Sequence, residues 1–273
     1  MSASLLALLA AASAAISSLF TKRMVGEFPP RQLIGPLLGL NSLLVAPFLL
    51  GTHWHFSETI ILLHLESAVT LIVSSGMIFA LFVHGSASAV STGQAMAPIP
   101  AVVFTALLLS TPVTWTQGIA AATVSLAVLL ALGTSFGELS RAKAIGLVAG
   151  AAIMNGLLVV LTKMLTNRGL GVAEIYCVRT AIGSMVWIAL APPRDLPLSS
   201  VPKLFTRSSF QTGYFALLIL AVQRGSPATV QTLAATTPLM LLVPTMLVRR
   251  HTLSGRLLFA SCAVVVGVAL TIR

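Results

Sequence analysis

Apolar residues run along this chain in helix-length blocks, and short polar or proline-containing connections separate one block from the next. A helix needs about 20 residues to cross the hydrocarbon core of a bilayer, and blocks of roughly that length recur throughout the sequence. They predict ten membrane-spanning helices, at residues 4–21, 31–50, 66–83, 86–108, 115–133, 143–162, 172–191, 207–224, 226–248 and 254–272.

Composition leads to the same class of protein. Hydrophobic residues make up 57% of the chain and charged residues 8%, whereas soluble domains have about 45–50% and about 25%. The mean hydropathy is +1.00. We therefore predict an all-α polytopic membrane protein without a separate soluble domain.

The first apolar block, residues 4–21, is rich in alanine, as the apolar part of a signal peptide can be. It lacks a positively charged segment in front, however, and Lys22 and Arg23 follow it, which is the reverse of the usual order of charge in a signal peptide. We expect residues 4–21 to be retained as a helix.

The chain also contains an internal repeat of about half its length. Residues 85–107 align without a gap with residues 225–247 at an offset of 140. Identical pairs include Gly85 and Gly225, Ser86 and Ser226, Val90 and Val230, Thr92 and Thr232, Ala95 and Ala235, and Pro98 and Pro238. Thr21-Lys22 and Thr162-Lys163 repeat at nearly the same offset. We divide the chain into two repeats, residues 1–137 and 138–273.

Five predicted spans per repeat have a topological consequence. An odd number makes the second repeat enter the bilayer from the opposite side, which gives two inverted five-helix repeats. Many secondary transporters have this architecture, with the substrate site near the midplane between the repeats. The alternative is a duplication kept for stability alone.

These repeats resemble the EamA-type transporters of the drug/metabolite transporter superfamily. The residues that carry the resemblance are Gly85 to Pro98, then Gly118, Ala120, Ala121 and Ala122, in the first half, Gly225 to Pro238 in the second, and Lys22 and Lys163, each ending the first helix of its half. The resemblance covers nearly the whole chain. It implies a ten-helix transporter whose termini lie in the cytoplasm.

The chain departs from that family pattern in two places. Many members carry a glutamate where the fourth helix of each repeat ends, whereas this chain has Leu109-Ser110-Thr111 and Arg249-Arg250-His251. An arginine near the start of the second helix is also common; Arg179 provides it in the second half, but Leu33 to Pro36 contain none. The two halves are therefore not expected to be functionally equivalent.

Proline and polar residues within the spans indicate a central cavity. Pro98 and Pro238 each remove a backbone hydrogen bond about a dozen residues into a helix, so we expect kinks at matched depth, although proline is common in membrane helices. Polar side chains in a membrane helix usually face the bundle interior. Those expected to bind substrate are Thr92, Gln94, Asn155, Tyr176, Arg179, Tyr214, Gln231 and Thr232. Each of them would also fit a simple interhelical hydrogen bond.

Arg179 is the cation placed well inside a predicted span. A guanidinium matches a carboxylate or phosphate with two parallel hydrogen bonds, so Arg179 is expected to anchor an anionic group, unless it extends to the interface or pairs with Glu174. The six carboxylates, Glu27, Glu58, Glu66, Glu138, Glu174 and Asp195, all fall in loops or at helix ends by these boundaries. A transporter of cationic drugs needs a buried acid, so we expect a neutral, zwitterionic or anionic metabolite.

The net charge of +10 is spread over short loops and forms no basic domain, so nucleic acid is not an expected partner. One side of the membrane would carry Lys22, Arg23, Arg31, Arg141, Lys143, Arg194, Lys203, Arg207, Arg249, Arg250 and Arg256, and the other Lys163, Arg168, Arg224 and Arg273. The positive-inside rule then puts both termini outside the cell, in conflict with the family resemblance. A misassigned span, a reversed insertion or insertion in both senses would each account for the conflict.

Neither catalytic nor metal-binding motifs appear. The sequence has no G-x-S-x-G, H-E-x-x-H or P-loop pattern, and the spacing of His53, His55 and Glu58 is expected to be that of solvated interfacial groups. His84 is a candidate for a gate or proton site. We expect no enzyme activity, no cofactor and no metal.

These features lead to three functional hypotheses. The first is a secondary transporter in a plasma or inner membrane that exports a small metabolite, amino-acid-like or an organic anion, by alternating access. The second is a non-transporting scaffold or accessory subunit, and the third is a lipid-carrier translocator. Glycines spaced four apart, Gly35 and Gly39 and again Gly146 and Gly150, fit tight packing within the monomer or in a homodimer.

Overall fold

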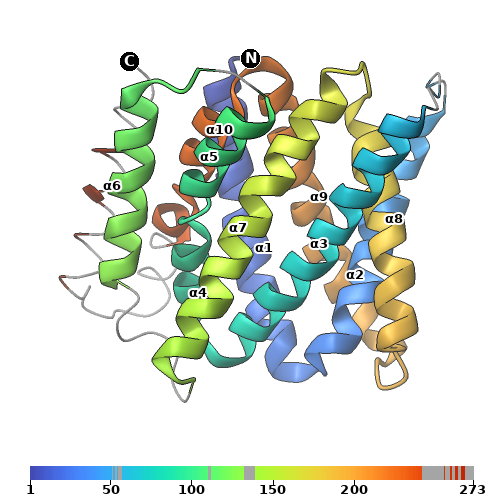
Figure 1. Cartoon of the computed structure of the whole chain (residues 1–273). Coiled ribbons are helices and arrows are strands. Elements are labelled where there is room, and N and C mark those ends of the chain that lie inside the picture. The colour runs from blue at the N-terminus through green and yellow to red at the C-terminus, as the bar shows by residue number, and fades with distance from the viewer. Residues whose placement is uncertain are drawn as a thin grey trace.

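The computed structural model describes residues 1–50, 52, 54, 57–109, 112–131, 139–241, 255, 259, 262, 263, 266 and 267. In this part of the chain every regular element is a helix: α1 (Ala3–Glu27), α2 (Pro30–Val45), η1 (Ala46–Leu49), α3 (Glu58–His84), α4 (Ala87–Gln94), α5 (Pro98–Leu108), α6 (Trp115–Ala131), α7 (Arg141–Thr166), α8 (Val172–Leu190), η3 (Leu198–Ser200), α9 (Val201–Arg224) and α10 (Pro227–Ala234). The long helices stand side by side in one bundle (Figure 1).

Within the described residues, six helical segments are long and apolar enough to cross a membrane. They are α1, α2 continued by η1, α3, the segment Ala87–Leu108 formed by α4 and α5, α7 and α8. The structure thus has the multi-pass character that the hydropathy pattern predicted. Most of the span predicted at 254–272 lies outside the described residues.

Several predicted boundaries were wrong, and local chemistry explains the differences. Helix α3 begins at Glu58 rather than at 66, because the Ser57 hydroxyl caps its first turn by accepting the Ile60 N–H at 3.3 Å. Glu66 is therefore an exposed residue inside α3 and not at its end. Helix α9 begins at Val201 rather than at 207, which brings Arg207 nearly two turns into the helix.

The fourth span of the first half is interrupted. Helix α4 ends at Gln94, a turn follows, and Pro98 is the first residue of α5. The turn is closed by short-range hydrogen bonds, such as that from the Ala97 N–H to the Gln94 carbonyl at 3.0 Å. Proline is well suited to a helix start, where its missing N–H would have no partner in the helix.

The second half has the same interruption. Helix α10 ends at Ala234, Ala235 and Thr236 form the turn, and the chain is helical again from Thr237 to Leu241. Pro238 therefore follows the restart by one residue. Both halves thus place a break in the helical ladder at repeat-equivalent positions.

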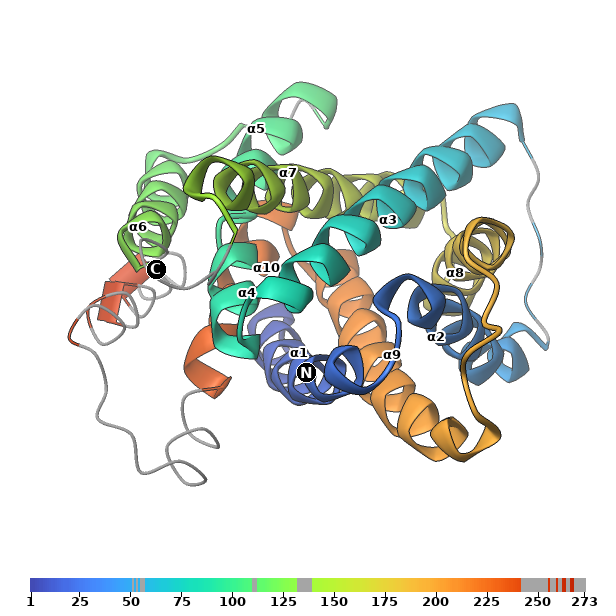
Figure 2. The ribbon, with the colours of Figure 1, turned by 90° about the horizontal axis from the view of Figure 1, so that it is seen from below.

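The largest helix contacts join the two halves: α1 packs on α9, α2 on α8 and α3 on α7. Each pair is antiparallel. In α1 and α9, Leu6 lies with Leu218 and Val222, while Thr21 at the other end of α1 meets Arg207. Seen along the bundle, α1 and α9 lie together, and so do α2 and α8 (Figure 2).

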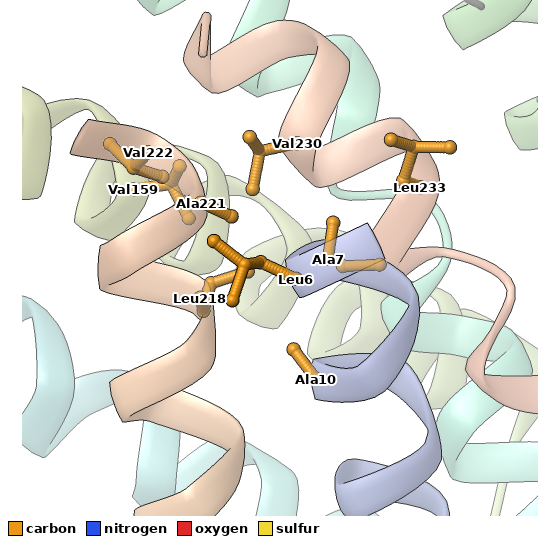
Figure 3. Close-up of a cluster of buried hydrophobic side chains, with 10 residues drawn as sticks. Leu6, Ala7, Ala10, Val159, Leu218, Ala221, Val222, Val230 and Leu233 are labelled. Atoms are coloured by element: carbon orange, nitrogen blue, oxygen red, sulfur yellow. The ribbon is translucent and has the colours of Figure 1, made fainter. Parts of the chain in front are cut away.

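A buried apolar cluster shows how one end of the bundle closes. It brings together Leu6, Ala7 and Ala10 of α1, Val159 of α7, Leu218, Ala221 and Val222 of α9, and Val230, Leu233 and Ala234 of α10. Figure 3 shows these side chains pointing toward one another from α1, α9 and α10. The core of this end therefore belongs to both halves.

Small residues allow α2 and α8 to approach closely. A Cβ atom at Gly35 would lie 2.7 Å from Cγ1 of Ile188, and one at Gly39 would lie 2.9 Å from Oγ of Ser184. The Ser184 hydroxyl also donates to the Gly35 carbonyl at 2.9 Å. The first glycine pair thus packs within the monomer. In the second pair Gly150 meets Met77, whereas a Cβ at Gly146 would meet nothing.

The two repeat-equivalent lysines make equivalent bonds. Lys22 donates through Nζ to the Phe82 carbonyl at 2.7 Å, and Lys163 donates to the Val222 carbonyl at 2.9 Å. Each ammonium thus satisfies the last turn of the third helix of its own half, where a cation is favourable. Neither lysine ends its helix, contrary to the prediction, because α1 continues to Glu27 and α7 to Thr166.

Candidate functional site

A central cavity of about 80 Å³ lies where both halves meet. Its lining is Ala14, Ser18, Thr21, Ile34, Leu37, Leu38, Asn41, Leu71, Ser74, Ser75, Ile78, Phe79, Phe82, Gln94, Asn155, Arg207, Gln211, Tyr214 and Phe215. These residues come from α1, α2, α3, α4, α7 and α9. Hydroxyl and amide groups, one tyrosine and one guanidinium line this chamber together with apolar side chains, and no carboxylate is among the lining residues.

Two smaller cavities extend this chamber. A linking cavity of about 30 Å³ shares Gln94, Asn155 and Tyr214 with it. An Arg179 cavity of about 10 Å³ shares Asn155, Tyr214 and Gln231 with the linking cavity. A water needs about 10–15 Å³ of such space, so the Arg179 cavity holds about one water molecule and no metabolite.

A wide vestibule of about 1210 Å³ adjoins the central cavity on the other side. It lies between the C-terminal parts of α3 and α8 and the start of α2. Ile34 and Phe79 line both spaces, and their side chains are buried. They form the wall between the vestibule and the central cavity.

Arg179 is enclosed by aromatic and hydroxyl groups. The side chain is 1% exposed. Its NH1 donates to the Thr162 hydroxyl at 3.0 Å, and its guanidinium carbon lies 5.3 Å from the Tyr176 ring centre and 5.0 Å from that of Phe215. Cation–π contacts of a desolvated arginine contribute about 2 kcal/mol. The Nε donor has no hydrogen-bond partner within the described part of the chain.

Pairing of Arg179 with Glu174, the alternative left open by the sequence, is not what the structure shows. The Glu174 carboxylate instead accepts the Gly171 N–H at 2.6 Å and caps the first turn of α8. The ion pairs found among the described residues are those of Glu27 with Arg23 and Lys203. A buried cation without an acid partner is costly, and what compensates Arg179 within the described residues is the Thr162 hydroxyl and the two aromatic rings.

Arg207 is a second buried cation. It is 8% exposed and lines the central cavity. Its Nε donates to the Thr21 hydroxyl at 3.0 Å, and its guanidinium carbon lies 5.9 Å from the Phe79 ring centre. Sequence reasoning placed Arg207 at a helix end among the orientation charges. The spacing of Arg207, Gln211 and Tyr214 along one helical face was the signal that would have placed it in the cavity.

The comparisons with known proteins give the family. The sequence pattern of the EamA-like transporter family matches residues 1–133 and 142–273. The chain belongs to the EamA-like transporter family. The resemblance to the drug/metabolite transporter superfamily is thus confirmed.

Structural comparison adds a likeness of fold. One solved structure, described only as a crystal structure of a protein, matches this EamA-like transporter with a TM-score of 0.74 at 16% sequence identity, covering 97% of this chain and 98% of that chain. At that identity the likeness concerns the fold alone. Among curated proteins, none matches the chain.

The predicted substrate residues of the EamA-like transporter take three different positions. Gln94, Asn155, Tyr214, Gln231 and Arg179 line the chain of cavities. Tyr176 is fully buried and packs against Phe215 with ring centres 5.2 Å apart. The repeat-equivalent Thr92 and Thr232 line none of the three cavities.

The two threonines differ in their hydrogen bonds. The Thr232 hydroxyl donates to the Ala228 carbonyl of its own helix at 2.8 Å. The buried Thr92 hydroxyl has no hydrogen-bond partner within the described ranges. Sequence reasoning missed Ser18, Ser74 and Gln211, which line the central cavity. The sequence alone does not tell whether a serine or glutamine of a membrane helix faces a cavity or a neighbouring helix.

The histidines do not assemble a metal site within the described residues. His53 and His55 lie outside them. His84 is exposed and lines the vestibule. His64, which sequence reasoning did not single out, is buried on α3 with Nδ1 unpartnered in the described part of the chain.

Proposed function

We propose that this chain is a secondary transporter that exports a small metabolite with an acidic group, amino-acid-like or an organic anion, across the cell membrane (inner or plasma) by alternating access. One observation carries the proposal: a chain of polar cavities between the two halves ends on Arg179, a buried cation with no acid partner among the described residues. A bound carboxylate would compensate that charge with two parallel hydrogen bonds.

The sign of the charge separates this proposal from export of cationic drugs. No carboxylate lines the central, linking or Arg179 cavities. A cationic substrate entering them would meet Arg207 and Arg179 at short range in a medium of low dielectric constant, where like charges repel strongly. A zwitterion or an anion is favoured instead.

The proposed architecture is ten spans in two inverted five-helix repeats. The three antiparallel helix pairs, the equivalent bonds of Lys22 and Lys163 and the matched breaks at residues 95–97 and 235–236 support it. These features are what a pseudo-two-fold axis in the membrane plane requires.

The helix contacts indicate which parts would move. Helix α1 packs on α9 and α10, whereas α7 packs on α3, α4 and α5. We therefore propose two moving bundles, each built from both halves, rather than one half rocking against the other. Rocking of whole halves would break the α1 to α9 and α3 to α7 contacts, the most extensive ones together with those of α2 and α8.

The test is counterflow of labelled amino acids and organic anions in proteoliposomes. We expect selective flux for wild type, loss in Arg179→Ala, and wild-type flux in Arg168→Ala, a control that removes an exposed arginine. The absence of ATP-binding motifs predicts that flux needs only a gradient. Folded protein without flux for any compound would contradict the proposal.

Two further variants separate the alternatives. In a scaffold the cavity amides are only interhelical contacts, so Gln94→Leu with Gln231→Leu would leave its function intact, whereas a transporter should lose most of its flux. Transbilayer movement of a labelled anionic lipid in the same vesicles, without movement of the soluble panel, would favour a lipid-carrier translocator.

A further inference from the structure

The Arg207 side chain is buried in the wall of the central cavity and is not a surface charge. Within the described ranges its guanidinium has one hydrogen-bond acceptor, the Thr21 hydroxyl at 3.0 Å. A guanidinium has five donors, and the ion pairs of the described residues do not include Arg207. Most of its hydrogen-bonding capacity therefore remains for another group in the cavity.

The internal repeat relates this arginine to Arg179 through their acceptors. Thr21 and Thr162 are equivalent positions in the first helix of each half, and each accepts a hydrogen bond at 3.0 Å from a buried guanidinium. Each guanidinium also lies over aromatic rings: Phe79 for Arg207, and Tyr176 and Phe215 for Arg179. The donors come from different helices, α9 and α8, so the pair is a structural equivalence that the sequence alignment alone does not show.

The approach to Arg207 is cationic as well. The vestibule that adjoins the central cavity carries Arg31 and Arg194. Its one carboxylate, Asp195, accepts a hydrogen bond from the Gln32 amide at 2.6 Å. Phe79 separates this vestibule from the central cavity and at the same time contacts the Arg207 guanidinium. An anion that enters from the vestibule therefore meets Arg207 before Arg179.

From this arrangement we propose that Arg207 forms a second oxyanion site, at the vestibule end of the pathway, for the carboxylate or phosphate group of the transported compound. Thr21 positions Arg207: its hydroxyl accepts from the guanidinium, while its own O–H donates to the Ser17 carbonyl at 2.8 Å. The identity of that compound as cargo rests on the proposed function; the anion site itself does not. Arg207 binds the anion while the pathway faces the vestibule, and Arg179 binds it at the opposite end. Each arginine then sets the affinity at one face of the membrane.

The first experiment measures binding without transport. Wild type, Arg207→Gln, Arg207→Lys and the control Arg23→Gln, in detergent, are titrated with succinate, glutamate and inorganic phosphate at constant ionic strength, with the melting temperature as readout. Arg23 is an exposed arginine. We expect at least one anion to raise the melting temperature of wild type, and Arg207→Gln to raise the half-saturating concentration about tenfold, as loss of a charge-assisted bond predicts. Arg23→Gln should stay within twofold.

The second experiment measures sidedness. Half-saturation is compared on the two faces, in whole cells and in inside-out vesicles from the same cells. Arg207→Gln should weaken the vestibule face about tenfold and leave the other face within twofold, and Arg179→Gln should do the reverse. If Arg207→Gln does not fold, Arg207→Lys and Thr21→Val replace it with the same expected direction.

The outcomes distinguish the two proposals. Anion binding that depends on Arg207 without any flux would remove the transport proposal and leave the site. Flux together with Arg207→Gln binding within twofold of wild type would remove the site and leave transport. Absence of binding of all three anions to wild type would also overturn the site.

Discussion

The two ends of the chain of cavities each hold an arginine bonded to a threonine, but in different surroundings. At one end Arg179 is 1% exposed and faces a cavity of about 10 Å³. At the other, Arg207 faces a cavity of about 80 Å³ that shares a wall with a vestibule of about 1210 Å³. The structure is therefore closed around Arg179 and more spacious around Arg207, which is the asymmetry that one state of an alternating-access cycle has.

The two repeats share the threonine that accepts the hydrogen bond, but not the arginine that donates it. Thr21 and Thr162 occupy equivalent positions, but both arginines belong to the second half. A buried guanidinium needs a polar partner wherever it lies, so a threonine that both halves inherited could serve a cation supplied by either neighbouring helix. Equivalent function here does not require equivalent residues.

The largest expected effect is at the closed end. Arg179→Gln should lower flux at subsaturating substrate by at least about 100-fold, because hydrogen bonds to a charged group contribute about 1.5–3 kcal/mol each and two would be lost. Arg179→Lys should recover little, since an ammonium lacks the planar fork. Initial rates of counterflow measure both, and rates within threefold of wild type for Arg179→Gln would show that Arg179 does not bind the substrate.

The rate at which a thiol reagent labels an introduced cysteine should differ about tenfold between the Arg207 end and the Arg179 end. Ser18 lines the central cavity and its repeat equivalent Val159 lines the Arg179 cavity, so Ser18→Cys and Val159→Cys form a matched pair. In a background of Cys177→Ser and Cys262→Ser, a small charged thiol reagent should label Ser18→Cys the faster, because water reaches the larger space. Equal rates would mean that the two ends are equally open in the membrane.

Removing the shared acceptor should have a smaller effect. Thr21→Val and Thr162→Val each delete one hydrogen bond to a guanidinium while keeping the shape of the side chain, at a cost of about 1 kcal/mol. We expect half-saturation to rise about fivefold, at the vestibule face for Thr21→Val and at the opposite face for Thr162→Val. Sided flux assays check this, and an equal change at both faces in either variant would contradict separate sites.

The smallest effect concerns the mouth of the vestibule. Arg31→Gln with Arg194→Gln should slow uptake of an anion from that side about twofold at low salt, since exposed charges steer association. The effect should disappear near 1 M salt, where the Debye length is about 3 Å. A twofold loss that persists at high salt would instead indicate a structural role for these arginines.

Hydropathy was enough to predict the class of fold. It did not predict the start of α9 or the interruptions of two helices. The α7 and α8 boundaries differ from their predictions by a few residues, because apolar composition and the ends of these helices coincide. Helix α9 was placed too late, since Lys203 and Arg207 near its start resemble a loop. The interruptions after Gln94 and Ala234 were expected only as kinks, because the backbone pattern around a proline depends on its neighbours in space.

The site was predictable where chemistry alone marks a residue and not where orientation decides. Arg179 and the amides of Gln94, Asn155 and Gln231 are rare in apolar helices, and all line the cavities. Thr92 and Thr232 belong to a residue type that is frequent in these helices, and they line none of the three cavities. Arg207 was missed because it stood at the predicted start of its helix, although its spacing with Gln211 and Tyr214 already placed the three side chains on one helical face.

The helix pairing across the bundle has a consequence for the polypeptide itself. Because α1 packs on α9, α2 on α8 and α3 on α7, the buried apolar clusters of the described residues all draw on both halves. A chain cut between its halves would yield two fragments that complement each other only when synthesised together, each acting as the template on which the other folds. The two repeats thus depend on each other as the subunits of an obligate heterodimer do, although they belong to one chain.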